Sequence, residues 1–165
     1  MSPTIGSLCT GYGGLDMAVQ TIWPDARLAW VADNDPGAAR ILAHHHPDVP
    51  NLGDLTQINW QATQPVDILT AGFPCQPVSV AGRRAGTTDE RWLFDDITRA
   101  LRDLHPQPRL CVFENVPGLL TANHGDAMAR VVQGLASAHA AATGRPHARA
   151  SGSRAGAAGR GRCAS

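Results

Sequence analysis

The sequence contains no lysine, so its 14 basic residues are all arginine. Its 4 cysteines are widely spaced and form no CxxC pair, a pattern that argues against a structural zinc site and against a disulfide framework. No apolar run approaches the length of a membrane span, and the N-terminal residues do not read as a signal peptide. We therefore expect a reducing, cytoplasmic setting without a membrane partner.

Large apolar residues are absent from the C-terminal part of the chain. After Leu135 there is no Ile, Leu, Val, Met, Phe, Tyr or Trp, and six of the 14 arginines follow Asp126, after which no acidic residue occurs. Such a composition buries too little apolar surface to fold. We expect one folded part, residues 1–138, and a disordered Ala/Gly/Arg-rich tail, residues 139–165.

A strand, a glycine-rich turn and a helix open the chain. Thr4–Leu8 is a short apolar run, and Gly11-x-Gly13-Gly14 follows it. Glycines let a ligand approach the backbone, and a helix N-terminus favours polar or anionic groups. The pattern predicts a nucleotide-binding βαβ unit, although a plain tight turn is the alternative. The apolar residues at roughly helical spacing after the turn are Leu15, Met17, Ala18 and Ile22.

Acidic residues follow the second predicted strand, Ala26–Ala32. In nucleotide-binding folds an acid about 20 residues after the glycines accepts the ribose hydroxyls. A helix N-cap is the other interpretation, because Pro36 suits the first turn of a helix. We assign Asp33 to the ligand and Asp35 to the cap. Asp54, in a segment too short for a sizeable strand, would lie at the same edge of the sheet.

A cysteine marks the end of the third predicted strand. The stretch Asp67–Gly82 starts as a buried strand and breaks at Gly72, Pro74 and Pro77, which do not continue a ladder. Cys75 therefore lies at the edge where open α/β sheets bind ligands. A thiol on a turn that prolines restrict is a candidate nucleophile, and an inert buried thiol is the alternative.

A glutamate and an amide follow the last predicted strand, Leu110–Phe113, which comes after a predicted helix containing Trp92 to Leu104. Parallel neighbours would place Glu114 and Asn115 at the same edge as the cysteine. A further helix is predicted over Ala127–Leu135.

Two other cysteines, Cys9 and Cys111, lie in apolar segments and suit an inert role. The run His44-His45-His46 makes a poor metal chelate, because adjacent residues on a helix point in different directions. We therefore predict no metal site.

Six short blocks, in a fixed order, carry a family resemblance. The Pro-Cys-Gln core followed later by Glu-Asn-Val is its most specific part. On these residues the chain resembles the N-terminal half of a C5-cytosine DNA methyltransferase, over roughly Ile5 to Leu135. The family's substrate-contact block, its target recognition domain and its closing cofactor motifs have no counterpart here. The six blocks are Ser7–Gly14, Asp33–Asp35, Gly53–Leu55, Gly72–Ser79, Asp89–Phe94 and Phe113–Gly118.

The resemblance implies an α/β, Rossmann-like fold that uses S-adenosylmethionine, with parallel sheet order 3-2-1-4-5, incomplete at its C-terminal side. It implies methyl transfer to carbon 5 of a flipped cytosine in double-stranded DNA, in a restriction-modification or phage system. Cys75 would add to carbon 6, while Glu114 would hold the neighbouring ring nitrogen. The implied cofactor-binding residues are Leu8, Gly11, Gly13, Gly14, Asp33, Asn34, Asp54 and Pro74. The implied DNA contacts are Gln76, Ser79, Arg83, Arg84 and Asn115.

Three alternatives remain open on the sequence. An RNA cytosine methyltransferase would use the same chemistry. An inactive remnant would bind cofactor or nucleic acid without turnover, which agrees with the missing C-terminal blocks. A nicotinamide-dependent oxidoreductase would share the glycine turn, but Asp16 stands where its third glycine is expected.

Overall fold

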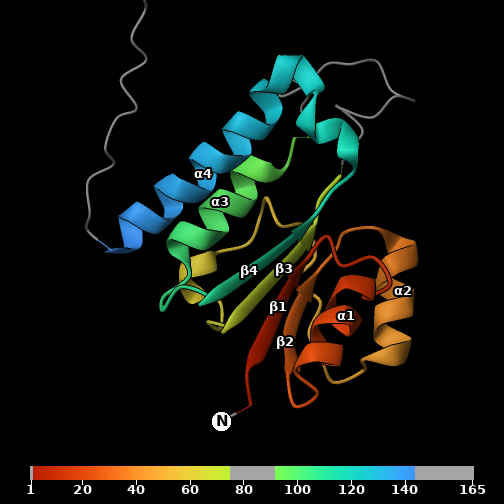
Figure 1. The fold of residues 1–165 in the computed structure, drawn as a ribbon. Helices are drawn as coiled ribbons and strands as arrows, with labels where there is room; N and C mark the ends of the chain where they lie inside the picture. The colour runs from red at the N-terminus through yellow and green to blue at the C-terminus, as the bar shows by residue number, and fades with distance from the viewer. Residues whose placement is uncertain (1, 75–91, 144–165) are drawn as a thin grey trace, which may run out of the picture.

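A single parallel sheet forms the centre of the protein. The computed structural model describes residues 2–74 and 92–143, and Figure 1 shows the sheet between two layers of helices. Four strands pair in the order β2-β1-β3-β4, and every pairing is parallel. The strands are β1 (Thr4–Leu8), β2 (Arg27–Ala32), β3 (Ile68–Gly72) and β4 (Leu110–Glu114).

The sheet order agrees with the predicted 3-2-1-4-5 for the four strands that form. The strand expected outside β2 is reduced to one parallel bridge between Val31 and Asn51. The segment from Asn51 onward then turns away from β2, because Gly53 has a φ of 75°, a conformation that favours glycine.

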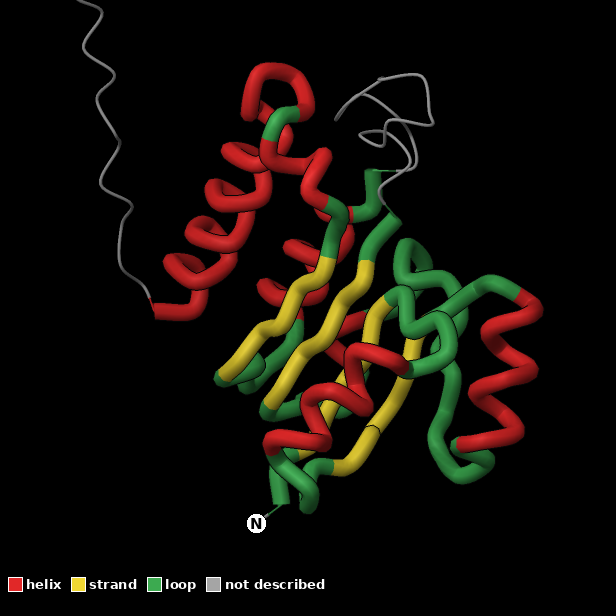
Figure 2. The backbone as a smooth tube through the Cα atoms, turned by 45° about the vertical axis from the view of Figure 1, so that its right-hand side comes forward, coloured by secondary structure: helices red, strands yellow, loops and turns green. Residues whose placement is uncertain are grey.

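Two helices cover each face of the sheet, as Figure 2 shows from a second direction. On one face lie α1 (Gly14–Ile22) and α2 (Pro36–His45), and on the other lie α3 (Phe94–Asp103) and α4 (Asp126–Thr143). Crossover helices cover both faces in this way because parallel strands need long connections. The short helices are η1 (Trp60–Ala62), η3 (Pro117–Leu120) and η4 (Ala122–Gly125).

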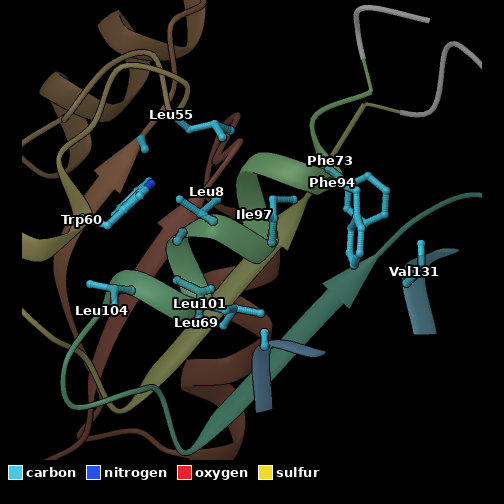
Figure 3. Close-up of a cluster of buried hydrophobic side chains, with 14 of the residues drawn as sticks. Leu8, Leu55, Trp60, Leu69, Phe73, Phe94, Ile97, Leu101, Leu104 and Val131 are labelled. Carbon is cyan, nitrogen blue, oxygen red and sulfur yellow. The ribbon is translucent and has the colours of Figure 1, made fainter. Parts of the chain in front are cut away.

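The larger part of the core lies between the sheet and α3. Successive strand residues point to opposite faces, so Leu8 and Leu69 project toward the same side and meet Ile97 and Phe94 of α3. Figure 3 shows these side chains together, with Leu101 and Leu104 farther along the helix. The helix that was predicted to contain Trp92 to Leu104 forms over Phe94–Asp103. Ile97 and Leu101 on it are buried, as are Trp92 and Leu104 beyond its ends, while Leu93 is partly buried.

The predicted apolar face of α1 is wrong. Met17 is 51% exposed and Ile22 is 69% exposed, whereas Asp16 and Val19 are buried. The strands β1 and β3, which face α1, explain why Asp16 points inward. They present the hydroxyls of Ser7 and Thr70, which both bind the Asp16 carboxylate. Hydrogen bonding to the sheet, rather than apolar periodicity, sets the orientation of this helix.

The last helix, α4, is longer than the predicted Ala127–Leu135 and extends to Thr143. Residues 139–143, which the composition placed in a disordered tail, continue the helix, because alanine is the strongest helix former. Residues 144–165 of the expected tail lie outside the described residues. Neither α4 nor another helix in the described ranges is long and apolar enough to cross a membrane.

A close contact between β1 and β2 explains why position 6 is glycine. The buried Trp30 side chain lies across β1, and its Nε1–H donates to Gln64 O at 2.8 Å. A Cβ atom placed on Gly6 would lie 2.3 Å from Trp30 Cζ2. The indole ring also packs on Trp60, with 5.5 Å between ring centroids, so it has little room to shift.

We predict that Gly6→Ala lowers the free energy of unfolding by about 2–3 kcal/mol, because an overpacked core forces side chains and backbone to move. Urea denaturation followed by circular dichroism measures the change. Gly72→Ala is the matched control, since a Cβ there would lie 3.6 Å from Glu114 Oε2, an ordinary contact. Equal losses in the two variants would contradict the explanation.

Candidate functional site

The carboxyl ends of all four strands lie along one edge of the sheet. Leu8 at the end of β1 is paired with Ala32 of β2 and with Ala71 of β3. Gly72 at the end of β3 is paired with Glu114 of β4. The loops that follow these strands therefore start side by side, as predicted from the sequence.

The glycine-rich turn after β1 has a left-handed backbone at three positions. The φ angles are 51° at Cys9, 59° at Gly11 and 86° at Gly13. A side chain is strained at such φ values, which explains the two glycines. Gly13 N–H donates to Thr10 O at 2.9 Å, and the turn leads directly into α1.

Asp33 fastens this turn to the end of β2. Its Oδ2 accepts from Gly11 N–H at 2.8 Å, and its Oδ1 accepts from Asp35 N–H at 2.9 Å. Asp35 is the N-cap of α2, accepting from Ala38 N–H at 2.8 Å, so its predicted capping role is confirmed. Each Asp33 oxygen retains a lone pair for a further donor, and its role toward a ribose stays a prediction.

Asp54 lies in the loop beyond the single bridge. Its Oδ1 accepts from Thr56 N–H at 2.9 Å and from the Thr56 hydroxyl at 2.8 Å. These bonds lower the pKa of Asp54, and a hydrogen bond from Asn34 adds to the effect. The carboxylate is therefore ionised over the neutral pH range and available to accept from a ligand.

Asn51 joins the Asp33 and Asp54 segments, a role that the sequence did not indicate. Its Oδ1 accepts from Asp33 N–H at 3.1 Å and from Gly53 N–H at 3.0 Å, while its Nδ2 donates to Asp33 O at 3.1 Å. Asn51 makes with its side chain the connection to the end of β2 that a paired strand would otherwise make. A single polar residue of this kind produces no periodic hydrophobic pattern in the sequence.

A cleft of about 310 Å³ opens between these loops. Three aspartates, Asp33, Asp35 and Asp54, line it together with several apolar side chains. Of the predicted cofactor residues, it brings together Asp33, Asn34, Asp54 and Pro74, whereas Leu8 and the three glycines are not among its lining residues. The lining consists of Cys9, Ala32, Asp33, Asn34, Asp35, Gly53, Asp54, Leu55, Thr56, Pro74 and Leu93.

Cys9 lines this cleft although it was predicted to lie in an apolar strand. It follows β1 directly and is half-buried. Burial, with a smaller contribution from the negative charge of Asp33, raises the pKa of the Cys9 thiol to about 12. The thiol is therefore protonated at neutral pH and unreactive, which agrees with its predicted inert role. Burial also raises the pKa of Cys111 to about 11.

A second cleft, of about 520 Å³, begins at the ends of β3 and β4. Glu114 and Asn115 lie among its lining residues, and Phe73 and Phe113 form apolar walls. Asn115 Nδ2 donates to Phe73 O at 3.1 Å, so this amide ties the exits of the two strands together. Because Phe73 lines the second cleft and Pro74 lines the first, the dipeptide lies between them.

The residues that follow this dipeptide lie outside the described residues. They include the predicted nucleophile and most of the predicted DNA contacts, so their positions stay predictions. They are Cys75, Gln76, Ser79, Arg83 and Arg84.

The family model for C-5 cytosine-specific DNA methylases matches residues 4–139. The chain belongs to that family. The predicted resemblance is confirmed, and the methylase fold accounts for the parallel sheet and for the two clefts at its carboxyl edge.

Known relatives extend beyond the matched stretch. The DNA N-6-adenine-methyltransferase of Escherichia phage P1 is 34% identical over 129 residues, which are 71% of this chain and 17% of that protein. The type II methyltransferase M.BsuFI of Bacillus subtilis is 33% identical over 135 residues, which are 81% of this chain and 32% of that protein. This methylase chain therefore spans at most about a third of their lengths.

A solved methyltransferase shares the fold. The crystal structure of the S. pombe Dnmt2 methyltransferase matches with a TM-score of 0.61 at 21% identity, covering 79% of this chain and 41% of that one. Among the described residues of the methylase chain, no group of three or more His, Cys, Asp or Glu side chains is arranged to hold a metal ion.

One buried carboxyl group lies behind the glycine turn. Asp16 is 2% exposed; its Oδ2 accepts from Ser7 Oγ–H at 2.8 Å and its Oδ1 from Thr70 Oγ1–H at 2.5 Å. It thereby links α1 to β1 and to β3, the strand that leads toward Cys75. Burial raises the pKa of Asp16 above 3.8, against the smaller opposing effects of the two hydroxyls and of His46.

We predict that the wild-type protein becomes less stable relative to Asp16→Asn as the pH rises from 3.8. Because its pKa is raised in the folded state, Asp16 binds a proton more tightly when folded. The contribution of Asp16 to stability is therefore present at pH values below its pKa in the unfolded chain. It is lost as the pH rises through its pKa in the folded protein. Urea titrations of both proteins across pH 4 to 8 measure the difference, with His46→Gln in both backgrounds to remove the nearby histidine charge. If the wild-type protein instead became more stable relative to Asp16→Asn with rising pH, the hydrogen bonds from the two hydroxyls would lower the pKa of Asp16 more than burial raises it.

Proposed function

We propose that the chain forms the cofactor-binding and nucleophile-bearing part of a DNA cytosine-5 methyltransferase. One observation carries the proposal. The Phe73-Pro74 dipeptide, directly before Cys75, lies between a cleft that three aspartates line and a cleft that Glu114 lines. A thiol directly after this dipeptide would be able to reach ligands in both clefts.

The first cleft has the chemistry that S-adenosylmethionine requires. The carboxylates of Asp33 and Asp54 suit the ribose hydroxyls and the adenine amine, while Leu55, Leu93 and Pro74 offer apolar surface for the purine ring. When bound, S-adenosylmethionine supplies an electrophilic methyl group. The glycine turn, fixed by the bond from Gly11 N–H to Asp33, would carry the backbone toward the methionine end.

Cys75 supplies the electrons for the reaction. Its thiolate forms a bond to carbon 6 of cytosine, and the displaced electron pair makes carbon 5 nucleophilic. Carbon 5 would then take the methyl group as that group's bond to the sulfonium sulfur breaks, which leaves a neutral thioether. Loss of the carbon-5 proton to a base restores the double bond and expels the cysteine thiolate, so the enzyme ends as it began.

Glu114 would act on the opposite side of the base. Glu114 lines the second cleft, and the strand register pairs it with Gly72 at the end of β3. A carboxyl group there can hold or protonate the ring nitrogen beside the exocyclic amine, which draws electrons from carbon 6 as the thiolate adds. Asn115 would keep the two strand ends together through its bond to Phe73 O.

The target base lies inside a DNA duplex, so it must flip out at a cost of a few kcal/mol. Gln76 and Ser79 would contact the flipped base and its surroundings, and Arg83 and Arg84 would contact phosphates. We propose a restriction-modification or phage setting, which agrees with the names of the relatives.

Adenine methylation is the second candidate, because the phage P1 relative is named for that reaction. The Pro-Cys-Gln core favours cytosine, since a carbon nucleophile must be generated by thiol addition whereas an exocyclic amine already carries a lone pair. The matched stretch is 17% of the phage protein, so the named reaction can reside in other parts of it.

We predict that the chain binds S-adenosylmethionine and that Asp54→Asn weakens the affinity by about tenfold, the effect of losing one hydrogen bond to a charged group. Isothermal titration calorimetry measures both constants. Asp48→Asn is the control, because Asp48 is exposed and does not line the cleft. Absence of binding to the wild-type chain, or equal losses in both variants, would overturn the assignment of this cleft.

We predict only trace methyl transfer by the isolated chain, all of it to carbon 5 of cytosine and none of it in Cys75→Ser. Labelled S-adenosylmethionine is incubated with duplex DNA and, separately, with RNA, and the product nucleosides are separated by mass spectrometry. N6-methyladenine would favour the adenine reaction, and incorporation into RNA alone would favour the RNA alternative. Rapid, Cys75-dependent turnover would show that the parts present in longer relatives are dispensable.

A further inference from the structure

Residues 53–56, which form one wall of the first cleft, do not belong to a strand. Gly53, Asp54, Leu55 and Thr56 line the first cleft. Within the described residues, the segment joins the sheet through the bridge at Asn51, the bond from Leu52 N–H to Val31 O and the bonds of the Asn51 side chain to Asp33, and not through a strand. Irregular backbone of this kind leaves carbonyl groups without ladder partners. These carbonyl groups therefore need hydrogen-bond donors that come from outside the sheet.

Arg99 of α3 binds three of these carbonyls. Its Nη2 donates to Leu55 O at 2.9 Å and to Thr56 O at 3.1 Å. Its Nη1 donates to Ile58 O at 3.1 Å. One guanidinium group therefore binds the backbone of the turn that begins at Asp54 at three carbonyls.

The guanidinium group is itself fixed by its helix. Asp96, one turn earlier on α3, accepts from Arg99 Nη2 at 3.2 Å, and both side chains are about a third exposed, at 31% and 30%. Leu55 is buried against the same core that α3 covers, and Figure 3 shows Leu55 near Trp60 and Ile97. Polar and apolar contacts thus anchor the wall to α3 together.

We propose that Arg99 is a positioning residue for the cofactor: by binding the carbonyls of Leu55, Thr56 and Ile58 it sets the place of Asp54 and Thr56 in the cleft. The cleft's lining, within the described part of the chain, does not include Arg99, so the residue acts through the turn and not on the ligand. This inference rests on the proposed binding of S-adenosylmethionine in the first cleft.

The planar fork of arginine is essential to this role. Two separate nitrogens donate to the carbonyls of Leu55 and Ile58, and the compact ammonium group of a lysine does not have this fixed fork geometry. Arg99→Lys keeps the charge and loses the fork, whereas Arg99→Met keeps the packing of the stem and loses both. Arg102→Met is the matched control, because Arg102 lies on the same helix and, among the described residues, contacts Thr98 Oγ1 at 3.5 Å and no carbonyl of the turn.

The first experiment measures amide hydrogen exchange without cofactor. Thr56 N–H binds the Asp54 carboxylate and Gln57 N–H binds Asp54 O, so both amides report whether the turn is formed. We expect them to exchange about tenfold faster in Arg99→Met and Arg99→Lys, with the amides of β1 and β3 unchanged. Unchanged exchange at Thr56 and Gln57, or faster exchange throughout the protein, would overturn the proposal.

The second experiment measures the affinities for S-adenosylmethionine and S-adenosylhomocysteine by calorimetry. Both Arg99 variants should bind each ligand about tenfold more weakly, because the wall would contact the part that the two ligands share. Arg102→Met should bind both ligands like the wild type. Wild-type affinity in Arg99→Met would overturn the inference. A wild-type chain that binds neither ligand would overturn the proposed function, and the exchange data would still decide whether Arg99 orders the wall.

Discussion

Parallel strand pairing constrains where each candidate site residue lies. β1 pairs with β2 and β3, and β3 pairs with β4, so all four strands end at one edge. Each exit is followed by a loop, since parallel strands cannot be joined by hairpins. The glycine turn, Asp33, the Phe73-Pro74 dipeptide and Glu114 become neighbours although they are far apart in the sequence. A change that shifts β1 would therefore affect both clefts.

Side chains, rather than a ladder, fasten these exits to one another. Asp33 binds Gly11 N–H, Asn115 binds Phe73 O, and Arg99 binds the carbonyls after Asp54. Buried backbone groups need such partners because an unpaired one costs about 1–3 kcal/mol. Two of the residues expected to bind ligands, Asp33 and Asn115, thus also hold the scaffold. Variants at these positions combine a loss of contact with a loss of shape, and affinity measurements alone do not separate the two effects.

Local patterns predicted much of the fold. The strand Thr4–Leu8 has the predicted bounds, and Asp35 caps the helix that begins at Pro36. Short apolar runs that glycine or proline ends leave few alternatives to a buried strand. The buried face of α1 was not predictable in this way, because Asp16 points inward to two hydroxyls on strands that are distant in sequence. The end of α4 was missed because a lack of large apolar residues was interpreted as disorder, although alanine favours a helix.

The sequence by itself determined the family, the order of the strands and the residue types that the proposed chemistry requires. Cys75, Glu114 and Asp33 were selected by motif and by their places after strands, both of which are properties of the chain alone. Only the tertiary structure decided that Cys9 lines the first cleft, that Asn51 replaces a strand and that Arg99 holds the cleft wall. These contacts join segments with no periodic relation to one another, and a hydrogen bond from a side chain to a distant carbonyl leaves no trace in local sequence.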